Sequence, residues 1–384
     1  MRLMEWQGKQ LLAKAKIPVP PGSVVETSEA AREVAARLGK PVMVKAQVRT
    51  GGRGKAGGIL RAADAPSAET AARELLGRDI LGRRVRQVLI EESFNAEREV
   101  YLGFTIDHGA RRSVLLASAE GGVEVEASCS ASGLAKAELN PLLPLPAYAV
   151  RAVLASAKIP HPLHPDLLDL AGKLYGLYKE WDATLLEVNP ILVLSDGTLM
   201  AADARMIIDD AAMGRQPEIA EWGASFPDAT VSEKLKREYD FDYVELDPGG
   251  NIGLISTGAG GTMTTIDLLT RAGGRVINFV DVRTGVIGRD PKRLIVTLDQ
   301  LAGKPNFRVL LVSIFGAITD LAVFAETLLA ALRARLIGAK VHVRLQGRNE
   351  EAARQILTAS DLMIHASLEA AVRAAVDSAK EGKS

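Results

Sequence analysis

The sequence predicts an α/β protein with a doubly wound parallel sheet in its carboxy-terminal part. From residue 251 onward, five short apolar runs alternate with five helical patterns. This alternation is typical of parallel strands joined by helices that cover both faces of the sheet. The earlier part of the chain mixes helices with strands at hairpin spacing, and 384 residues are enough for two or three domains. A first region of another kind is therefore expected, connected to the parallel sheet by residues 224–250.

The elements expected in the first region follow from apolar periodicity and from glycine and proline stops. Helices are expected over residues 5–15, 28–39, 65–77 and 164–181, and strands over residues 41–48, 85–93, 98–107 and 111–121. The last two strands flank an Asp-His-Gly-Ala turn and are expected to pair. Residues 127–165 contain six prolines and show no clear pattern.

The second region is more regular. Its strands are expected over residues 251–257, 275–282, 307–316, 340–347 and 362–366. The helices that follow them are expected over residues 262–274, 290–303, 318–338, 349–360 and 367–380. Because each strand leads into a helix, the turns after the strands meet at one edge of the sheet, which is where such folds bind ligands.

Composition narrows the possible partners. The chain has 47 basic and 47 acidic residues, which argues against a nucleic-acid-binding face. No stretch approaches the roughly 18 apolar residues of a membrane span. The pattern at the amino terminus is not that expected of a secretory signal or a transit peptide. Cys129 is the single cysteine, so no internal disulfide forms. We expect a cytoplasmic protein with no nucleic-acid or membrane partner.

A glycine-rich basic loop is the first candidate site. The stretch VKAQVRTGGRGKAGG, residues 44–58, has five glycines, four basic residues and no acid. Glycines let backbone amides approach a ligand, and the cations neutralise phosphate. The loop is not a GxxxxGK[ST] phosphate loop, and a solvated, mobile loop is an equally good interpretation of these residues alone. Lys45 favours a ligand, because a lysine inside an apolar strand needs a partner.

A hairpin over residues 184–206 is the second candidate site. If the loop Ser195-Asp196-Gly197 closes it, paired residue numbers sum to 392, so that Asn189 faces Asp203 and Glu187 faces Arg205. All four side chains then lie on one side of the hairpin. An amide oxygen and a carboxylate make a half-site for Mg²⁺ that phosphate and water complete. The alternative is a solvated polar face with one Glu–Arg pair, which is the commoner meaning of such a pattern.

These motifs resemble one family in order along essentially the whole chain. The matching segments are MEWQGKQLLAKAKIPVP, the glycine loop, VLIEESFNAEREVYLG, SAEGGVEVE, LLEVNPILVLSDGTLMAADAR, GNIGLISTGAG, NFVDV and SIFGAITD. They resemble the β subunit of succinyl-CoA synthetase, an ADP-forming acyl-CoA synthetase. The resemblance implies an ATP-grasp fold of two subdomains over residues 1–235, with residues 21–105 as the inserted smaller subdomain. A flavodoxin-like CoA-ligase domain over residues 236–384 would follow, as the strand–helix alternation also indicates.

The resemblance also implies roles for individual residues. Asn189 and Asp203 match the Mg²⁺ ligands, and Glu187 matches an acid that faces a phosphohistidine. Arg205 stands where the family usually has lysine and is expected to meet phosphate with a different geometry. The positions that match nucleotide contacts are Lys45, Gly52, Arg53, Gly54, Glu91, Phe94 (through its backbone) and Glu99.

The reaction implied by the resemblance converts ATP, a carboxylate and CoA into ADP, phosphate and an acyl-CoA. The phosphoryl group passes through a histidine on a separate α subunit, which also binds CoA. The five histidines of this chain, at positions 108, 161, 164, 342 and 365, lie in no phosphoryl-acceptor motif, which fits a β subunit with a partner. We expect an αβ or α2β2 assembly, Mg²⁺ or Mn²⁺, and ATP or GTP, with succinate as the expected acid.

The chain departs from the family at the acid site. It has Thr257-Gly258-Ala259-Gly260 for NGAG, Asp281-Val282-Arg283-Thr284-Gly285 for DVGGG, and Phe315-Gly316-Ala317-Ile318 for FGGI. Arg283 is expected to grip a carboxylate in bidentate fashion. The residues expected to bind the acid or phosphate are Thr257, Gly258, Arg283, Gly316, Ala317, Ile318 and Thr319.

Three interpretations of these departures stay open. The enzyme uses another dicarboxylate such as malate, it uses succinate with compensating changes, or the chain is a non-catalytic, nucleotide-binding regulatory paralogue. A fourth and weaker interpretation is an ATP-grasp carboxylate–amine ligase. The second α/β region counts against it, because such ligases need no domain of that kind.

Overall fold

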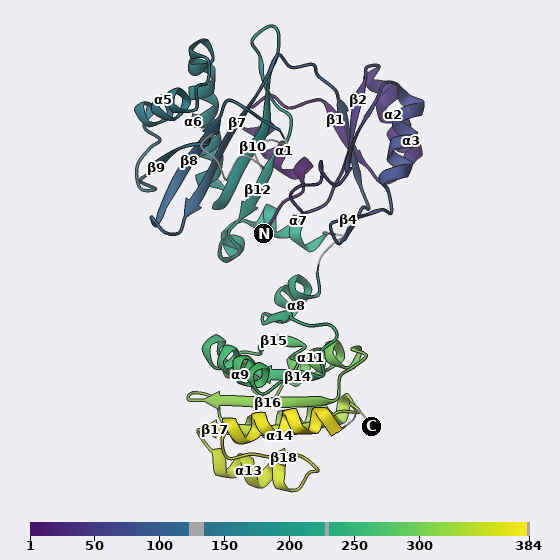
Figure 1. Ribbon diagram of the computed structural model, residues 1–384, viewed down its shortest axis with the longest axis vertical. Helices are drawn as coiled ribbons and strands as arrows, with labels where there is room; N and C mark the ends of the chain where they lie inside the picture. The colour runs from purple at the N-terminus through teal and green to yellow at the C-terminus, as the bar shows by residue number, and fades with distance from the viewer. Residues whose placement is uncertain (123–133, 227–229, 382–384) are drawn as a thin grey trace. The chain divides into compact units, whose positions relative to one another are not determined.

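The computed structural model describes residues 1–122, 134–226 and 230–381, and the chain divides into two compact units, Met1–Asp228 and Ala229–Ser384 (Figure 1). Cys129 and the end of the SAEGGVEVE segment lie outside the described residues. Each unit has its own sheets and its own apolar core. No helix in the described part of the chain is long and apolar enough to cross a membrane.

The first unit begins with helix α1 (Glu5–Lys14) and contains a four-stranded antiparallel sheet. The strand order is β1 (Gly22–Val25), β6 (Val88–Glu92), β2 (Val42–Ala46) and β3 (Ile59–Ala62). Helices α2 (Ser28–Leu38) and α3 (Ala65–Leu75) pack together on one side of it (Figure 1). Thr27 caps the start of α2, and Gly39 ends it with a left-handed φ of 63°, which a glycine adopts at no steric cost. A short hairpin, β4 (Asp79–Ile80) and β5 (Arg83–Arg84), follows α3.

A second sheet of the first unit has its centre at two long strands, β7 (Arg98–Asp107) and β10 (Ala183–Val193). Outside β7 lie β8 (Arg112–Ser118) and β9 (Ala135–Leu139), and β11 (Leu199–Ala201) and β12 (Arg205–Ile208) both pair with β10. Helices α5 (Ala147–Ser156) and α6 (His164–Glu180) cover it, with Phe104 of β7 against Tyr175 and Tyr178 of α6. Two 3₁₀ turns, η1 (His161–Leu163) and η2 (Asp210–Arg215), and helix α7 (Pro217–Ala224) complete this unit.

The hairpin register is the one predicted. Glu187 pairs with Arg205 and Ile191 with Ala201, so the paired numbers sum to 392 on both sides of an interruption. The returning strand is broken between β11 and β12, where Ala202 N–H donates to the Pro190 carbonyl, and the Asn189–Pro190 peptide bond is cis. Asn189 and Asp203 lie in this irregular middle, outside the regular ladder.

The second unit opens with α8 (Val231–Tyr239) and β13 (Asp242–Glu245) and then forms the expected parallel sheet. Strands β14 (Ile252–Ser256), β16 (Val309–Gly316), β17 (Lys340–Gly347) and β18 (Met363–Ile364) are all parallel neighbours. Strand β15 (Asn278–Asp281) differs from the expectation, because its regular ladder is antiparallel and runs with β13.

Strand β15 is joined to β14 in another way. A parallel bridge connects Ile252 with Val276, and the buried Asn278 amide exchanges two 2.9 Å hydrogen bonds with the Leu254 backbone. A side chain here takes the place of ladder hydrogen bonds. The resulting order, β15-β14-β16-β17-β18, is that of a flavodoxin-like sheet. The predicted fold class is confirmed.

Helices cover both faces of this sheet, as a doubly wound fold requires (Figure 1). One core contains apolar residues of α11 (Lys292–Ala302), α12 (Leu321–Ala334) and α13 (Glu350–Thr358). The other contains residues of α9 (Ala259–Arg271) and α14 (Leu368–Glu381). The short helix α10 (Thr284–Ile287) lies in the turn after β15.

Candidate functional site

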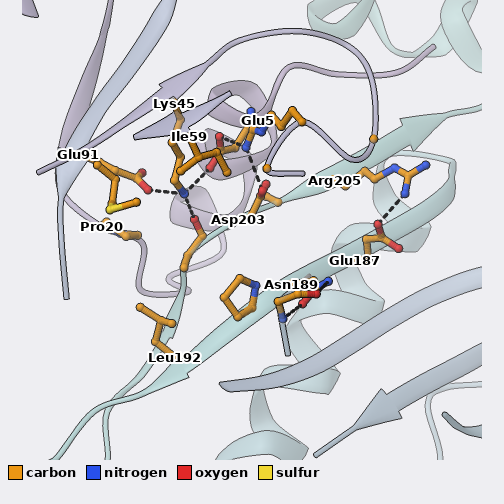
Figure 2. A pocket seen from close by; sticks show the side chains of 18 of the residues that line it. Glu5, Pro20, Lys45, Ile59, Glu91, Glu187, Asn189, Leu192, Asp203 and Arg205 are labelled. Atoms are coloured by element: carbon orange, nitrogen blue, oxygen red, sulfur yellow. Dashed lines mark hydrogen bonds and ion pairs between the residues drawn. The ribbon is translucent and has the colours of Figure 1, made fainter. Parts of the chain in front are cut away.

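A cavity of about 420 Å³ in the first unit gathers the residues singled out at the nucleotide and metal positions (Figure 2). Its walls come from α1, β2, the glycine loop, β6 and the β10–β12 hairpin, which lie far apart in the sequence. The predicted residues that line it are Lys45, Gly52, Arg53, Gly54, Glu91, Phe94, Glu99, Glu187, Asn189, Asp203 and Arg205. The fold therefore brings together in one cavity two motifs that the sequence separates by more than a hundred residues.

Lys45 lies on strand β2, and its buried side chain lines the cavity. Its Nζ lies 3.0 Å from Glu5 Oε1 and 2.6 Å from Glu91 Oε1, and it donates to the Ala202 carbonyl at 2.6 Å. Burial alone would lower the pKa of Lys45, but the charges of Glu5 and Glu91 outweigh it and raise that pKa. The ammonium has three protons, and all three have acceptors.

Arg53 lies in the glycine loop, and its side chain is also buried and hydrogen-bonded. Its Nη1 donates to the Ala46 carbonyl at 3.0 Å, and its Nη2 donates to Glu5 Oε2 and, at 2.9 Å, to Asp203 Oδ2. Burial opposes its charge, yet the carboxylates of Glu5 and Asp203 raise the pKa of Arg53. Gly52, directly before it, has a φ of 74°, a conformation that glycine adopts readily.

The metal positions offer hard oxygen donors. Asn189 Oδ1 accepts from Gly122 N–H at 2.6 Å and its Nδ2 donates to the Gly122 carbonyl at 3.0 Å, so the amide oxygen is fixed in orientation. Asp203 contributes a carboxylate on the facing segment. Within residues 1–122, 134–226 and 230–381 no group of three or more His, Cys, Asp or Glu side chains could hold a metal. An amide and one carboxylate suit Mg²⁺ that keeps water and phosphate oxygens as its other ligands, so the residues present fit the expected ion.

Glu187 and Arg205 form the far wall of the same cavity. Arg205 Nη1 donates to Glu187 Oε1 at 2.9 Å (Figure 2). The Tyr101 hydroxyl donates to Glu187 Oε2 at 3.3 Å. Arg205 Nε–H is buried and has no hydrogen-bond partner among the residues that the structure describes. A buried donor without an acceptor is costly, so this group is suited to an anionic ligand.

The apolar part of the cavity lies next to Phe94. Its ring packs against a small cluster formed by Leu192, Met200 and Ala202, and Phe94, Leu192 and Ala202 line the cavity. The site thus has a charged part, with Lys45 and Arg53, and an apolar part. A ligand with both phosphates and an aromatic base matches that division.

Two residues of this site were not singled out in the sequence. Glu5 bridges Lys45 and Arg53, and Lys9 contacts Glu5 Oε1 at 2.9 Å and Glu91 Oε2 at 2.5 Å. Both belong to α1, and both are buried. A signal for them exists in the sequence, because Glu5 and Lys9 are four residues apart in one predicted helix and so share a face.

The turns of the second unit bring three hydroxyls together. Thr284 Oγ1 lies 2.8 Å from Thr319 Oγ1 and 3.4 Å from Thr257 Oγ1, and Thr257 Oγ1 donates to Asp281 at 3.3 Å. These residues follow β14, β15 and β16, so the predicted meeting of the three turns holds for Thr257 and Thr319. Thr284, which was not among the expected acid-binding residues, lies between them. The neighbouring Ala317 and Ile318 are exposed, and Gly258 has a φ of 78° at the start of α9.

Arg283 is placed differently from the expectation. Its Nη1 pairs with Asp240 at 3.1 Å and its Nη2 with Asp242 at 3.0 Å. The side chain is therefore directed to the α8–β13 segment, while the hydroxyl cluster contains its neighbour Thr284. This arrangement removes the basis for assigning a carboxylate grip to Arg283.

Comparison with known proteins gives a consistent picture over the whole chain. The ATP-grasp domain model matches residues 2–193, and the CoA-ligase model matches residues 255–377. A solved structure of ATP citrate lyase from Methanothrix soehngenii superposes with a TM-score of 0.77 over 98% of this chain and 99% of that chain, at 19% identity. At that identity the likeness shows the fold alone.

The sequence relatives are closer. The chain is 39% identical over 387 residues to the succinate–CoA ligase [ADP-forming] subunit beta of Rubrobacter xylanophilus, with all of both chains covered. It is 39% identical to the protein of the same name from Halorubrum lacusprofundi, with 99% of both chains covered. The two domain models match one after the other along the chain, and the relatives match it from end to end. The chain therefore belongs to the family of ADP-forming succinate–CoA ligase β subunits.

Proposed function

We propose that the chain is the β subunit of an ADP-forming acid–thiol ligase that acts on a short dicarboxylate, with succinate as the expected acid. Its first unit binds Mg-ATP, and its second unit holds the acid or phosphate at the Thr257–Thr284–Thr319 cluster. A partner α subunit supplies CoA binding and the histidine that carries the phosphoryl group. The observation that carries the proposal is the single cavity in which all the expected nucleotide and metal residues meet.

The residues of the cavity fit the first half of this reaction. Lys45 and Arg53 offset the charge of the β and γ phosphates, and Phe94 with its apolar neighbours receives the base. Phosphoryl transfer is mostly a matter of positioning and charge. Mg²⁺, held by Asn189 and Asp203, would neutralise phosphate charge when bound. The bond from the γ phosphorus to the β–γ bridging oxygen breaks and a bond to the partner's histidine nitrogen forms, which leaves ADP.

Glu187 and Arg205 are suited to receive the incoming imidazole and phosphoryl group. Glu187 is an acceptor for an imidazole N–H, and Arg205, which lines the same cavity, has a buried Nε–H without a partner among the described residues. An arginine here donates from a planar fork, whereas the lysine usual in the family is a point charge. The phosphoryl group then passes from the histidine to the acid carboxylate, and the CoA thiol displaces phosphate to give the thioester.

A second candidate acid is supported by one observation. Thr257 and Thr284 place two hydroxyls where the family has an asparagine and a glycine, and the threonine side chain at 284 occupies space in the turn. A threonine hydroxyl can both donate and accept a hydrogen bond, so this cluster matches an acid that itself carries a hydroxyl, such as malate.

The test is an acid panel. The chain would be co-purified with its α partner, and CoA-dependent ADP release would be followed with succinate, malate and related acids. We expect turnover with a dicarboxylate, abolished by Asp203→Asn and retained by Asp196→Asn in the exposed hairpin loop. Tight Mg-ATP binding without turnover on any acid would contradict the proposal and indicate a nucleotide-binding regulatory role.

A further inference from the structure

Four buried charges under the nucleotide cavity form a closed ring. Glu5 Oε1 is shared by Lys9 at 2.9 Å and Lys45 at 3.0 Å, while Glu91 contacts Lys45 through Oε1 at 2.6 Å and Lys9 through Oε2 at 2.5 Å. Within the ring, each charge thus has two partners of opposite sign. All four side chains are at most 7% exposed, so solvent screens these pairs little.

Glu5 is also the link between this ring and Arg53. Its Oε2 accepts from Arg53 Nη2 and from Gln47 Nε2, the latter at 3.3 Å. Burial would raise the pKa of Glu5, but the charges of Arg53, Lys45 and Lys9 hold that pKa well below its ordinary value. Glu5 is therefore an anion at neutral pH, bound to both cations that the proposed function assigns to phosphate.

Lys45 and Arg53 have few N–H donors left for a phosphate. Every proton of Lys45 and both Nη2 protons of Arg53 already have acceptors. A phosphate oxygen gains a direct contact to the Lys45 ammonium or to Arg53 Nη2 only by displacing a present partner. Glu5 is the one partner that the two cations share, so its displacement frees a donor on each of them at once.

We propose that Glu5 is a positioning residue that occupies the place of a phosphate on Lys45 and Arg53 in the ligand-free protein, and that Lys9 retains it when nucleotide arrives. The inference rests on the proposed nucleotide function of the cavity. After the exchange Glu5 keeps Lys9 and Gln47 as donors, so its carboxylate stays paired in the buried site. Glu5 thus sets the affinity of the site for phosphates while Lys9, which does not line the cavity, acts through it.

The net charge of the cluster predicts opposite effects of substitutions at Glu5 and Lys9 on the affinity for Mg-ATP. The cluster of Glu5, Glu91, Asp203, Lys9, Lys45 and Arg53 has three acids and three bases and is neutral. Glu5→Gln leaves one excess positive charge and removes the competitor, so Mg-ATP should bind about tenfold more tightly. Lys9→Gln leaves one excess negative charge and should weaken Mg-ATP binding by about the same factor. The double variant is neutral and should bind within about threefold of the original chain.

The experiment is a calorimetric titration of the full chain with Mg-ATP and with adenosine. Opposite shifts for the two single variants, confined to Mg-ATP, support the proposal, since adenosine carries no phosphate. The matched control on the same helix is Lys14→Gln, whose exposed side chain pairs with Glu218. If Glu5→Gln does not fold, the comparison of Lys9→Gln with the charge-balanced double variant measures the same effect.

The remaining outcomes separate this inference from the proposed function. Weaker binding in both single variants, or equal shifts for adenosine and Mg-ATP, would mean a structural role only and would overturn the inference. Unchanged Mg-ATP affinity in Glu5→Gln would overturn it as well. If the unmodified chain binds no Mg-ATP at all, the proposed function fails first and the inference falls with it.

Discussion

At the scale of single residues, Arg283 is constrained in both its backbone and its side chain. Its φ of 50° is left-handed, a conformation that costs roughly 1 kcal/mol for a residue with a side chain. Its guanidinium pairs with Asp240 and Asp242 at the surface, where ion pairs contribute little. The backbone cost and the ion pairs are therefore of similar size.

This balance leads to a prediction for two substitutions. Arg283→Gly relieves the backbone and should leave the free energy of unfolding within about 0.5 kcal/mol. Arg283→Ala keeps the left-handed cost and loses the pairs, so it should be less stable than Arg283→Gly by about 1 kcal/mol. Denaturant titrations measure the difference. Neither change should alter acid preference in the coupled assay, whereas a changed preference would return Arg283 to the acid site.

Lys45 illustrates how far residue-level prediction reaches. A lysine inside an apolar strand predicts a charged partner or a ligand, and Lys45 does line the cavity with acidic partners on both sides. Which partners it has could not be derived from the sequence, because Glu5, Glu91 and Ala202 come from three distant segments. A propensity describes one residue, while an ion pair depends on where two chain segments meet.

At the scale of secondary-structure elements, the ends of β16 and β17 pack backbone against backbone. Gly316 and Gly347 are partners in the parallel ladder. A Cβ on Gly347 would lie 2.1 Å from the Gly316 carbonyl oxygen, and its φ of 134° already excludes most side chains. This close approach fixes the start of the turn that leads to Thr319.

Gly347→Ala should therefore disturb both the stability of the second unit and the turn that the proposed function assigns to the acid. We expect a loss of about 2 kcal/mol in the free energy of unfolding, together with a raised KM for the acid and little change in nucleotide affinity. Gly338→Ala is the matched control, since no atom lies within 4 Å of its added Cβ and its φ is ordinary. An unchanged KM in Gly347→Ala would show that the turn tolerates displacement.

Elements differ in how well the sequence predicts them. The hairpin register followed from a three-residue loop and period two, and it is confirmed by Glu187 opposite Arg205. Strand β15 was expected in the parallel sheet, yet its regular ladder is with β13, a segment expected to be a connection. Helix α5 lies in a proline-rich stretch that shows no clear pattern. Local periodicity does not predict which strands pair. The pairing of β15 with β13 depends on contacts between segments that are far apart in the sequence.

At the scale of the whole molecule, the unfolding of the two units can be followed separately. All three tryptophans, at positions 6, 181 and 222, belong to the first unit. In the second unit, His342 of β17 is buried with Nδ1 2.9 Å from His365 and Nε2 3.0 Å from Ser378 of α14. Burial, with smaller effects from His365 and Lys340, lowers the pKa of His342 to about 4.

This difference predicts acid sensitivity of the second unit. The unfolded imidazole has a pKa of about 6.5, so the unfolded state takes up a proton that the folded state refuses. The stabilisation is present above about pH 6.5 and is lost as the pH falls toward about 4. The stability of the second unit, followed by circular dichroism, should decrease as the pH falls from about 6.5 toward about 4. His342→Gln should reduce this dependence of stability on pH.

Tryptophan fluorescence supplies the internal comparison, because it follows the first unit alone. His108→Gln, at an exposed histidine of the first unit, is the control variant and should leave the circular dichroism profile unchanged. Equal pH dependence in the original chain and His342→Gln would contradict the assignment.

The closed ring of Glu5, Lys9, Lys45 and Glu91 also constrains how this sequence could diverge. A single change of charge in the ring leaves a buried partner uncompensated, and removing one partner of a buried pair costs about 3–5 kcal/mol. A second change of opposite sign restores neutrality. Positions 5, 9, 45 and 91 should therefore vary as one unit among relatives. Helix α1 would then change together with strands β2 and β6, although these elements are far apart in the sequence.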